Sequence, residues 1–174
     1  MRRPKIFETH LMKHLFTLLA ICSFMMASHA QSGIPSVVLK DLNGNSIDTG
    51  KLTNDGNPIL ICFWATWCGP CKKELNTYAD LYADWQKETG VKIYAVSIDD
   101  QRTTNSVKPY VNSVSWEYEV LLDVNKTFSQ ALGVTNPPHT FLLNGNGEIV
   151  WQHNGYAAGD EEEVYLELLR HIKQ

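Results

Sequence analysis

A pair of cysteines between an apolar run and a helical pattern constrains this chain more than any other feature. Residues 58–65 (PILICFWA) form a continuous apolar run, which is typical of a strand buried on both faces of a sheet. From Cys71 to about Gly90, bulky residues recur every three or four positions and predict an amphipathic helix. Cys68 is therefore expected at the N-terminus of this helix, and Cys71 in its first turn.

This position favours thiol chemistry at Cys68. Unpaired N–H groups and the positive end of the helix dipole stabilise an anion, so the pKa of the Cys68 thiol is expected to lie below that of a free cysteine. Cys71 is close enough to close a disulfide, while Gly69 leaves the approach open and Pro70 removes one backbone donor. A zinc site would need a second Cys or His pair at ligand spacing, and the sequence has none. The strand–loop–helix context predicts a redox-active cysteine pair.

Strands and helices are expected to alternate along the rest of the chain. A hairpin with an Asn-Gly turn is predicted near residues 34–48, and a strong strand at residues 91–98. The remaining predicted elements are a helix at 102–112, a strand at 116–122, a short helix at 125–132, hairpin strands at 140–143 and 148–152, and a helix at 160–172. This alternation predicts right-handed crossovers and a partly parallel sheet in one α/β domain.

The cysteine motif and a downstream segment together resemble a known family. Residues 67–71 (WCGPC) are similar to the active-site sequence of thioredoxins. Residues 63–66 (FWAT), 72–75 (KKEL) and 136–143 (NPPHTFLL) extend this similarity to the TlpA-like and ResA-like extracytoplasmic thioredoxins. The resemblance covers about residues 34–173. It implies a thioredoxin-like α/β fold, with a central mixed sheet flanked by helices, an N-terminal hairpin and one strand–helix insertion.

The resemblance also implies thiol–disulfide exchange. Cys68 would attack a disulfide of a protein substrate, and Cys71 would resolve the mixed disulfide. The Gly-Pro pair between the cysteines matches thioredoxin, which acts as a reductant. We therefore expect reduction of disulfides in secreted or periplasmic proteins, with a membrane electron donor to recharge the site. No cofactor and no metal ion are expected.

Glu74 is the candidate proton acceptor for Cys71. It lies one turn after Cys71, on the same helix face, and matches the glutamate that ResA-like proteins place beside their cysteines. The alternative is a solvent-exposed side chain, which is common for helical glutamates. Cys62 stands where thioredoxin has an aspartate, and its place in an apolar strand predicts a buried, unreactive thiol.

Residues beside the cysteines are the first set of candidate substrate contacts. Trp67 precedes Cys68 and is expected to present a flat surface to a bound protein. Gly69 and Pro70 complete the exposed part of the motif.

A second set of candidate contacts is the loop Pro137-Pro138-His139. By resemblance, Pro138 is the family's cis-proline, which packs over the disulfide. The residue before it pairs its backbone with an extended substrate in thioredoxin-like proteins, but Pro137 has no N–H to donate. His139 stands where many relatives have threonine, and it either tunes the thiolate or lines the loop.

The first thirty residues are typical of a secretory signal peptide. Lys13 precedes an apolar run at residues 15–26, which is short for a membrane span, and residues 28–30 (SHA) offer small side chains where signal peptidase reads. Cleavage after this triplet would leave residues 31–174 as the thioredoxin-like domain, outside the cytoplasm. An uncleaved membrane anchor and lipid attachment at Cys22 are the alternatives, and cleavage is favoured.

Charge and cysteine content exclude other classes of protein. Residues 1–30 hold four of the 15 basic residues and one of the 19 acidic ones, so the rest carries 11 basic and 18 acidic residues and a formal net charge of −7. Such an acidic domain is a poor nucleic-acid binder. Three of the four cysteines lie in residues 31–174, which is too few for a disulfide-stapled scaffold. The domain is expected to be a monomer.

Two other functions use the same fold. Peroxiredoxins place threonine or serine three residues before the peroxide-reducing cysteine, but here that residue is Ala65, and Thr66 is one position too close. A Cu(I) carrier would use Cys68, Cys71 and His139, although copper carriers of this fold usually space their cysteines one residue wider. Thiol–disulfide exchange is the main prediction.

Overall fold

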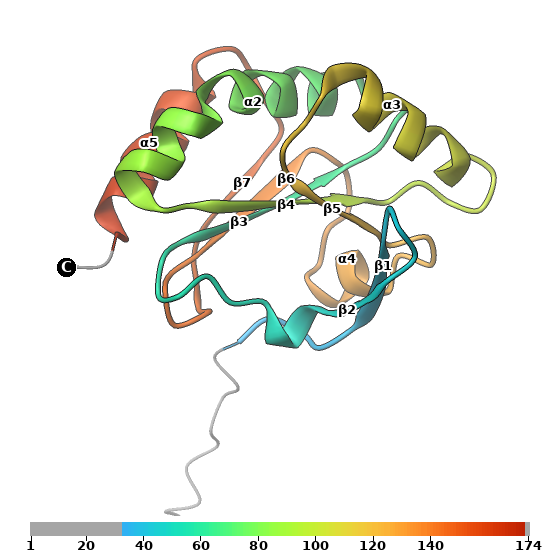
Figure 1. Ribbon diagram of the computed structural model, residues 1–174, viewed down its shortest axis with the longest axis horizontal. Coiled ribbons are helices and arrows are strands. Elements are labelled where there is room, and N and C mark those ends of the chain that lie inside the picture. Colours follow the sequence, from blue (N-terminus) through green and yellow to red (C-terminus); the bar gives the residue numbers. More distant parts are fainter. Residues whose placement is uncertain (1–32, 173–174) are drawn as a thin grey trace, which may run out of the picture. The chain divides into compact units, whose positions relative to one another are not determined.

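The apolar run forms strand β3 (Ile59–Trp64) inside a seven-stranded sheet in the computed structural model, which describes residues 33–172 (Figure 1). Every residue of β3 is buried, because the strand has a neighbour on each side and packed layers above and below. It pairs in parallel with β4 (Lys92–Ser97) and antiparallel with β6 (His139–Leu143). The strand order is β2-β1-β5-β4-β3-β6-β7. The predicted signal peptide lies outside the described residues.

The other strands complete the sheet at its two edges. β1 (Val38–Asp41) and β2 (Ser46–Asp48) form the expected N-terminal hairpin, and β1 pairs antiparallel with β5 (Glu119–Leu122). β5 pairs in parallel with β4. At the opposite edge, β7 (Ile149–Asn154) pairs antiparallel with β6. The predicted mixed sheet is thus confirmed.

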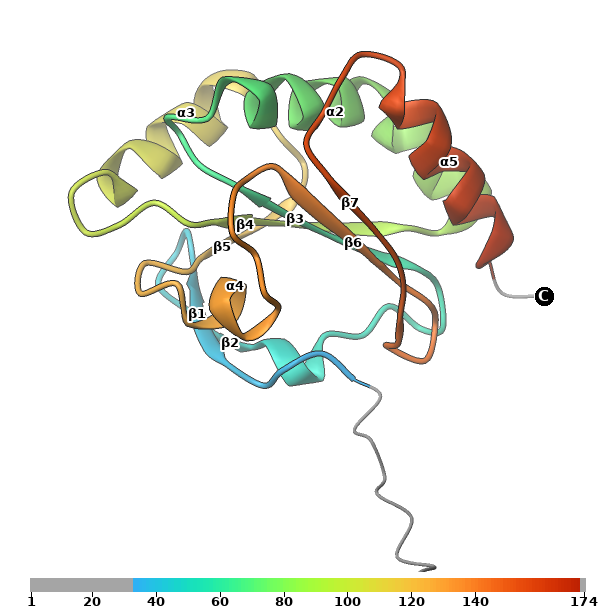
Figure 2. The same ribbon diagram turned by 180° about the vertical axis from the view of Figure 1, so that it is seen from behind.

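Helices cover both faces of this sheet. α2 (Gly69–Thr89), α3 (Val107–Val114) and α5 (Asp160–Arg170) lie on one face, and α4 (Thr127–Ala131) lies on the other (Figures 1 and 2). The units β4–α3 and β5–α4 both precede β6, which confirms the predicted insertion. Within residues 33–172, no helix combines the length and the apolar character needed to cross a membrane.

Two elements differ in extent from the prediction. The helix expected at residues 102–112 starts only after a turn of 3-10 helix. The strand expected at residues 116–122 begins at Glu119. Its first part does not pair because Trp116 and Tyr118 turn toward α2, where the indole N–H and the phenol O–H donate hydrogen bonds of 2.8 and 2.7 Å. Propensity alone does not reveal this tertiary contact.

α2 is fixed to the sheet by one buried face. The buried residues recur at helical spacing and are Cys71, Glu74, Leu75, Tyr78, Tyr82, Trp85 and Thr89. Burial of each large apolar side chain stabilises the fold by about 1.5–3 kcal/mol. The helix ends at Gly90, whose φ of 68° is a conformation that favours glycine. Its N-terminal turn, which carries the cysteines, is therefore held by the packing of the whole helix.

Gly145, in the turn between β6 and β7, touches the backbone of another loop. A Cβ atom at Gly145 would lie 2.0 Å from the carbonyl oxygen of Gly56. We expect Gly145→Ala to lower the free energy of unfolding by about 1–3 kcal/mol, because two backbones would have to separate. Urea denaturation measures this change. Asn146→Ala, at an exposed position of the same turn, is the control, and equal stability of the two variants would contradict the expectation.

Candidate active site

Cys68 and Cys71 form a disulfide at the N-terminus of α2, with Cα atoms 5.4 Å apart. Cys68 is the N-cap residue, and its sulfur accepts a hydrogen bond of 3.2 Å from the backbone N–H of Cys71. The two side chains differ in exposure, since Cys68 is 6% exposed and Cys71 is fully buried. The sulfur that a partner can reach is therefore that of Cys68.

The residues around Cys68 form an exposed rim. Trp67 is 58% exposed although it is a large aromatic side chain. Gly69 and Pro70 are also exposed. Pro70 occupies the start of the helix, where its missing N–H would have no helical partner in any case. The three predicted contact residues of the motif thus surround the accessible sulfur.

Glu74 is a buried carboxyl group one turn after Cys71. Its side chain is 1% exposed. Tyr78 and Thr140 both donate hydrogen bonds to Oε1, at 3.1 and 3.0 Å. Oε2 is buried and has no hydrogen-bond partner among the described residues. The predicted burial on the helix face of Cys71 is present, and the exposed alternative is wrong.

Burial raises the pKa of Glu74 from 4.5 to about 7. Desolvation is the largest cause, and the negative charge of Asp160 adds to it. The hydrogen bonds from Thr140 and Tyr78 act in the opposite direction but do not compensate. At neutral pH, Glu74 is therefore close to equally populated in its acid and carboxylate forms.

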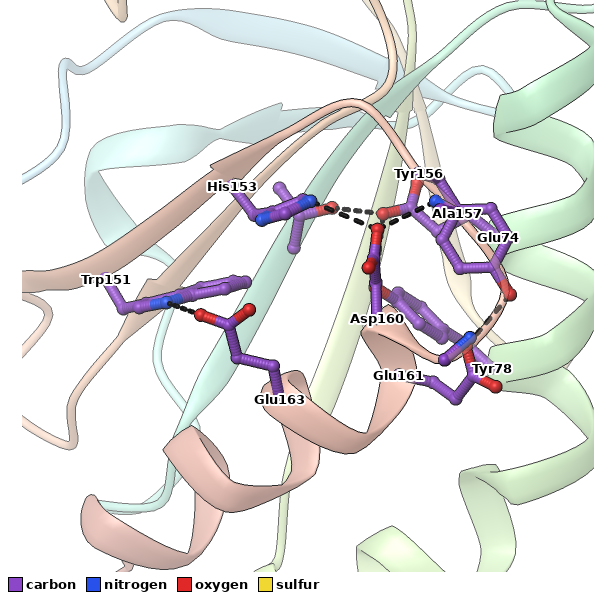
Figure 3. A network of polar contacts seen from close by, with 11 residues as sticks. Glu74, Tyr78, Trp151, His153, Tyr156, Ala157, Asp160, Glu161 and Glu163 are labelled. Carbon is purple, nitrogen blue, oxygen red and sulfur yellow. Dashed lines mark hydrogen bonds and ion pairs between the residues drawn. The ribbon is translucent and has the colours of Figure 1, made fainter.

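The negative charge that acts on Glu74 is that of Asp160, at the corner between β7 and α5. Figure 3 shows Glu74 on α2 beside this corner, with Asp160 at the start of α5. Asp160 accepts a hydrogen bond of 2.7 Å from the backbone N–H of Ala157 and lies 3.3 Å from Nε2 of His153. Tyr156 donates a hydrogen bond of 3.0 Å to Glu161. These contacts hold the acidic start of α5 in place at this corner.

Cys62 is a free and fully buried thiol. It lies on β3 opposite Thr140 of β6, whose hydroxyl also contacts Glu74. Burial, and then the charge of Glu74, raise the pKa of the Cys62 thiol well above its usual value. A neutral thiol without access to solvent is a poor nucleophile, as predicted from the apolar strand.

The proline loop leads into β6. The peptide bond between Pro137 and Pro138 is cis. Pro138 is buried, and its carbonyl oxygen accepts a hydrogen bond of 2.9 Å from the backbone N–H of Gly155. Pro137 is half-buried. The loop and the β7–α5 corner are thus joined directly.

His139 faces away from the active-site helix. Thr140 points toward α2, and successive strand residues point to opposite faces, so the imidazole lies on the other side of the sheet. The ring stacks on Phe141 at 4.4 Å, and Nε2 lies 3.1 Å from Oε1 of Gln152. Burial lowers the pKa of His139. This position suits a residue that lines the loop and does not tune the thiolate.

Three polar residues near the site were not singled out from the sequence. Tyr78 is four residues after Glu74, so helical spacing predicts a contact between them. Thr140 lies on β6 and contacts Glu74, and Asp99 lies two residues after β4 and contacts Thr66, so both contacts depend on the order of strands in the sheet.

The fold and the cysteine pair define a thioredoxin-like thiol–disulfide oxidoreductase. The chain belongs to the AhpC/TSA family, whose sequence model matches residues 30–152, and within it to the ResA-like and TlpA-like proteins. It is 33% identical over 149 residues to the thiol-disulfide oxidoreductase ResA of Halalkalibacterium halodurans, covering 84% of this chain and 82% of that protein. ResA of Bacillus subtilis is 32% identical over 139 residues, with coverages of 80% and 75%.

Solved structures show the same fold. An uncharacterized thioredoxin-like protein from Porphyromonas gingivalis is 45% identical, with a TM-score of 0.72, over 80% of this chain and 91% of that one. A putative thiol:disulfide interchange protein DsbE from Chlorobium tepidum is 25% identical, with a TM-score of 0.71, over 81% and 96% of the two chains. These similarities bear out the resemblance found in residues 63–75 and 136–143.

The raised pKa of Glu74 makes stability depend on pH. Between pH 4.5 and about 7 the folded state holds this proton more tightly than the unfolded chain, so the free energy of unfolding falls as pH rises and levels off above pH 7. The full contribution is about 3 kcal/mol. Glu74→Gln should remove this slope in urea unfolding measured from pH 4 to 8.

Asp84→Asn, at an exposed position of the same helix, is the matched control and should keep the slope of the parent protein. Parallel pH profiles of the parent and Glu74→Gln would mean that Glu74 ionises at its ordinary pH.

Proposed function

We propose that this protein reduces disulfide bonds of secreted or periplasmic proteins through a dithiol–disulfide cycle of Cys68 and Cys71. The observation that carries the proposal is a disulfide between two cysteines of different exposure. Cys68, the N-cap residue, is 6% exposed, and Cys71 is fully buried. Glu74, one turn further along the same buried face, supplies a proton acceptor. The proposed catalytic residues are therefore Cys68, Cys71 and Glu74.

In the first step, the Cys68 thiolate attacks one sulfur of the substrate disulfide. The helix N-terminus and the backbone N–H of Cys71 stabilise the negative charge before the attack. The substrate S–S bond breaks, and its second sulfur leaves as a thiolate that takes a proton from water. A mixed disulfide between Cys68 and the substrate remains.

In the second step, Cys71 resolves this mixed disulfide. Its buried thiol must first lose a proton, and the carboxylate form of Glu74 accepts it because its pKa is close to 7. The Cys71 thiolate then attacks the Cys68 sulfur, and the S–S bond between Cys68 and the substrate breaks. The substrate sulfur leaves as a thiolate and takes up the proton that Glu74 had accepted, directly or through water, so that the substrate is released as a dithiol. Two electrons have passed to the substrate, and the Cys68–Cys71 disulfide is the oxidised product. A membrane electron donor would return the two electrons.

The residues between the cysteines support reduction of substrate disulfides over their formation. Gly69 and Pro70 between the cysteines are those of thioredoxin, a reductant. The names of the relatives from H. halodurans and B. subtilis support exchange with disulfides in general.

A location outside the cytoplasm is part of the proposal. The apolar run at residues 15–26 and the small residues at 28–30 support secretion with cleavage of residues 1–30. The free domain would then work as a soluble monomer that meets its protein substrates and its donor by diffusion.

Two contacts argue against the alternative functions. Thr66 is the threonine nearest to Cys68 in the chain. Its hydroxyl donates a hydrogen bond of 2.6 Å to Asp99 and therefore does not donate to the Cys68 sulfur. A peroxidase of the peroxiredoxin type would need such a hydroxyl at its reactive sulfur. His139 lies on the sheet face opposite Thr140 and α2, so it does not complete a copper site with the two cysteines.

Replacement of single cysteines tests the order of attack. Cys71→Ser should form a stable mixed disulfide through Cys68 with substrate proteins, since the resolving thiol is missing. Cys68→Ser should form none and should lose disulfide reductase activity. Non-reducing gels and mass spectrometry of the trapped species, made in the native host, measure both effects and identify the substrates.

Cys62→Ser is the control, because this buried thiol should not affect trapping. Equal trapping by the Cys68 and Cys71 variants would contradict the assigned roles. Trapped partners that are all cytoplasmic would contradict the location.

Pro137 limits the backbone pairing that a peptide substrate can make. Pro137→Thr restores an N–H at the residue before Pro138, and one added hydrogen bond is worth about 0.5–1.5 kcal/mol. We expect kcat/KM for a short disulfide peptide to rise, by up to about tenfold. Asn136→Thr is the control, since it changes the exposed neighbouring residue without adding this donor. A Pro137→Thr variant that folds normally and is no faster would show that the missing donor does not limit recognition.

A further inference from the structure

The loop that leads from β3 to the cysteines is a tight turn. The backbone N–H of Cys68 donates a hydrogen bond of 3.0 Å to the carbonyl oxygen of Ala65. Thr66 and Trp67 are the two central residues of this turn. It places the Trp67 side chain in solvent and brings Cys68 to the N-cap of α2. The orientation of the reactive sulfur therefore depends on how firmly this turn is held.

Asp99, two residues after the end of β4, holds this turn. Its Oδ2 accepts a hydrogen bond of 2.8 Å from the backbone N–H of Thr66, and its Oδ1 accepts one of 2.6 Å from the Thr66 hydroxyl. Ser97, at the end of β4, donates a further hydrogen bond of 2.8 Å to Oδ2. The carboxylate is 1% exposed. All three donors are uncharged, so the carboxylate depends on them for its stabilisation.

The order of strands explains why this contact forms. β3 and β4 run in parallel, with Trp64 opposite Ser97. The hydrogen bond of 2.8 Å from Ile98 N–H to the Trp64 carbonyl continues the pairing past the end of both strands. The next residue on the β4 side is Asp99, which therefore meets the turn just beyond Trp64.

We propose that Asp99 is a positioning residue for the thiol–disulfide exchange, and that it acts by anchoring Thr66 so that the turn delivers Cys68 to the N-cap position. This inference rests on the proposed role of Cys68 as the attacking thiol. Asp99 touches neither the sulfurs nor the substrate. Its effect on the reaction passes through Thr66, which it holds by both the backbone N–H and the hydroxyl.

The anchor acts on the thiolate of the reduced enzyme. The Cys68 sulfur accepts a hydrogen bond from the Cys71 N–H only while the turn keeps the sulfur over the first turn of α2. A turn released from Asp99 samples other orientations, and the thiolate then loses part of this stabilisation. The expected result is a Cys68 that ionises at higher pH and attacks more slowly near neutral pH.

Two matched pairs of variants separate the anchor from charge. Asp99→Ala and Asp99→Asn both remove the negative charge, but asparagine can still accept from the Thr66 N–H and donate to the Thr66 hydroxyl. Thr66→Val and Thr66→Ser both keep Asp99, and only serine keeps the hydroxyl contact. Asp99→Ala loses both contacts of the anchor, and Thr66→Val loses only the hydroxyl contact, whereas Asp99→Asn and Thr66→Ser can keep both.

The measurement is the pH midpoint of Cys68 alkylation by iodoacetamide in the reduced full-length protein, followed by mass spectrometry of the Cys68 peptide. We expect the midpoint of Asp99→Ala to lie about half a pH unit above that of Asp99→Asn, and that of Thr66→Val to lie above that of Thr66→Ser by a smaller amount, because the Thr66 N–H contact remains. At pH values well below the midpoint, a shift of about half a unit would make alkylation about threefold slower. Thermal unfolding of each variant checks that it is folded.

The proposal requires both shifts when all four variants fold. Equal midpoints within either pair would overturn it, because the anchor would then have no effect on the sulfur. If Asp99→Ala does not fold, the Thr66 pair alone decides the outcome. A parent midpoint no lower than that of a free thiol would instead refute the proposed role of Cys68, which keeps the two failures distinct.

Discussion

The packing of α2 on β3 is the constraint on which the rest of the structure depends. The strand is buried on every side, and the helix lays a face of apolar and aromatic residues on it. This packing fixes the helix N-terminus. The backbone that caps the Cys68 sulfur is therefore already ordered, and no further conformational entropy is lost when the thiolate forms. The same packing withdraws Cys71 from solvent. The packing of these two elements thus accounts for the difference between Cys68, which is 6% exposed, and Cys71, which is fully buried.

Glu74 shows how this packing also sets the proton chemistry. A carboxyl group on the buried face of α2 loses its hydration, and two hydroxyl donors at one oxygen only partly replace it. The acidic start of α5 adds a charge of the same sign nearby. The pKa of this group is therefore raised to about 7, which suits the proton acceptor that the proposed cycle requires. An exposed glutamate at the same distance in sequence would remain ionised and would serve only as a charge.

The sequence predicted the fold well because its signals were local. The apolar run at residues 58–65 and the helical spacing after Cys71 placed the central strand, the active-site helix and the N-cap cysteine. Glu74 followed from its position one turn after Cys71 together with the resemblance to ResA-like proteins. Contacts between segments distant in the sequence were harder to predict. Trp116 and Tyr118 lie within the strand predicted at residues 116–122, but they bind α2 instead. Asp99 meets Thr66 only because β4 lies beside β3, and no spacing along the chain reveals that.

The unequal exposure of the two sulfurs affects how the site treats small molecules. A low-molecular-weight disulfide reaches Cys68 as a protein does and leaves half of itself attached there. Cys71 needs no access to solvent to displace it, because the attacking sulfur approaches from inside the protein. In the proposed cycle, small adducts would be released by the same internal step that releases a protein. The buried sulfur would then protect the site from inactivation by small disulfides.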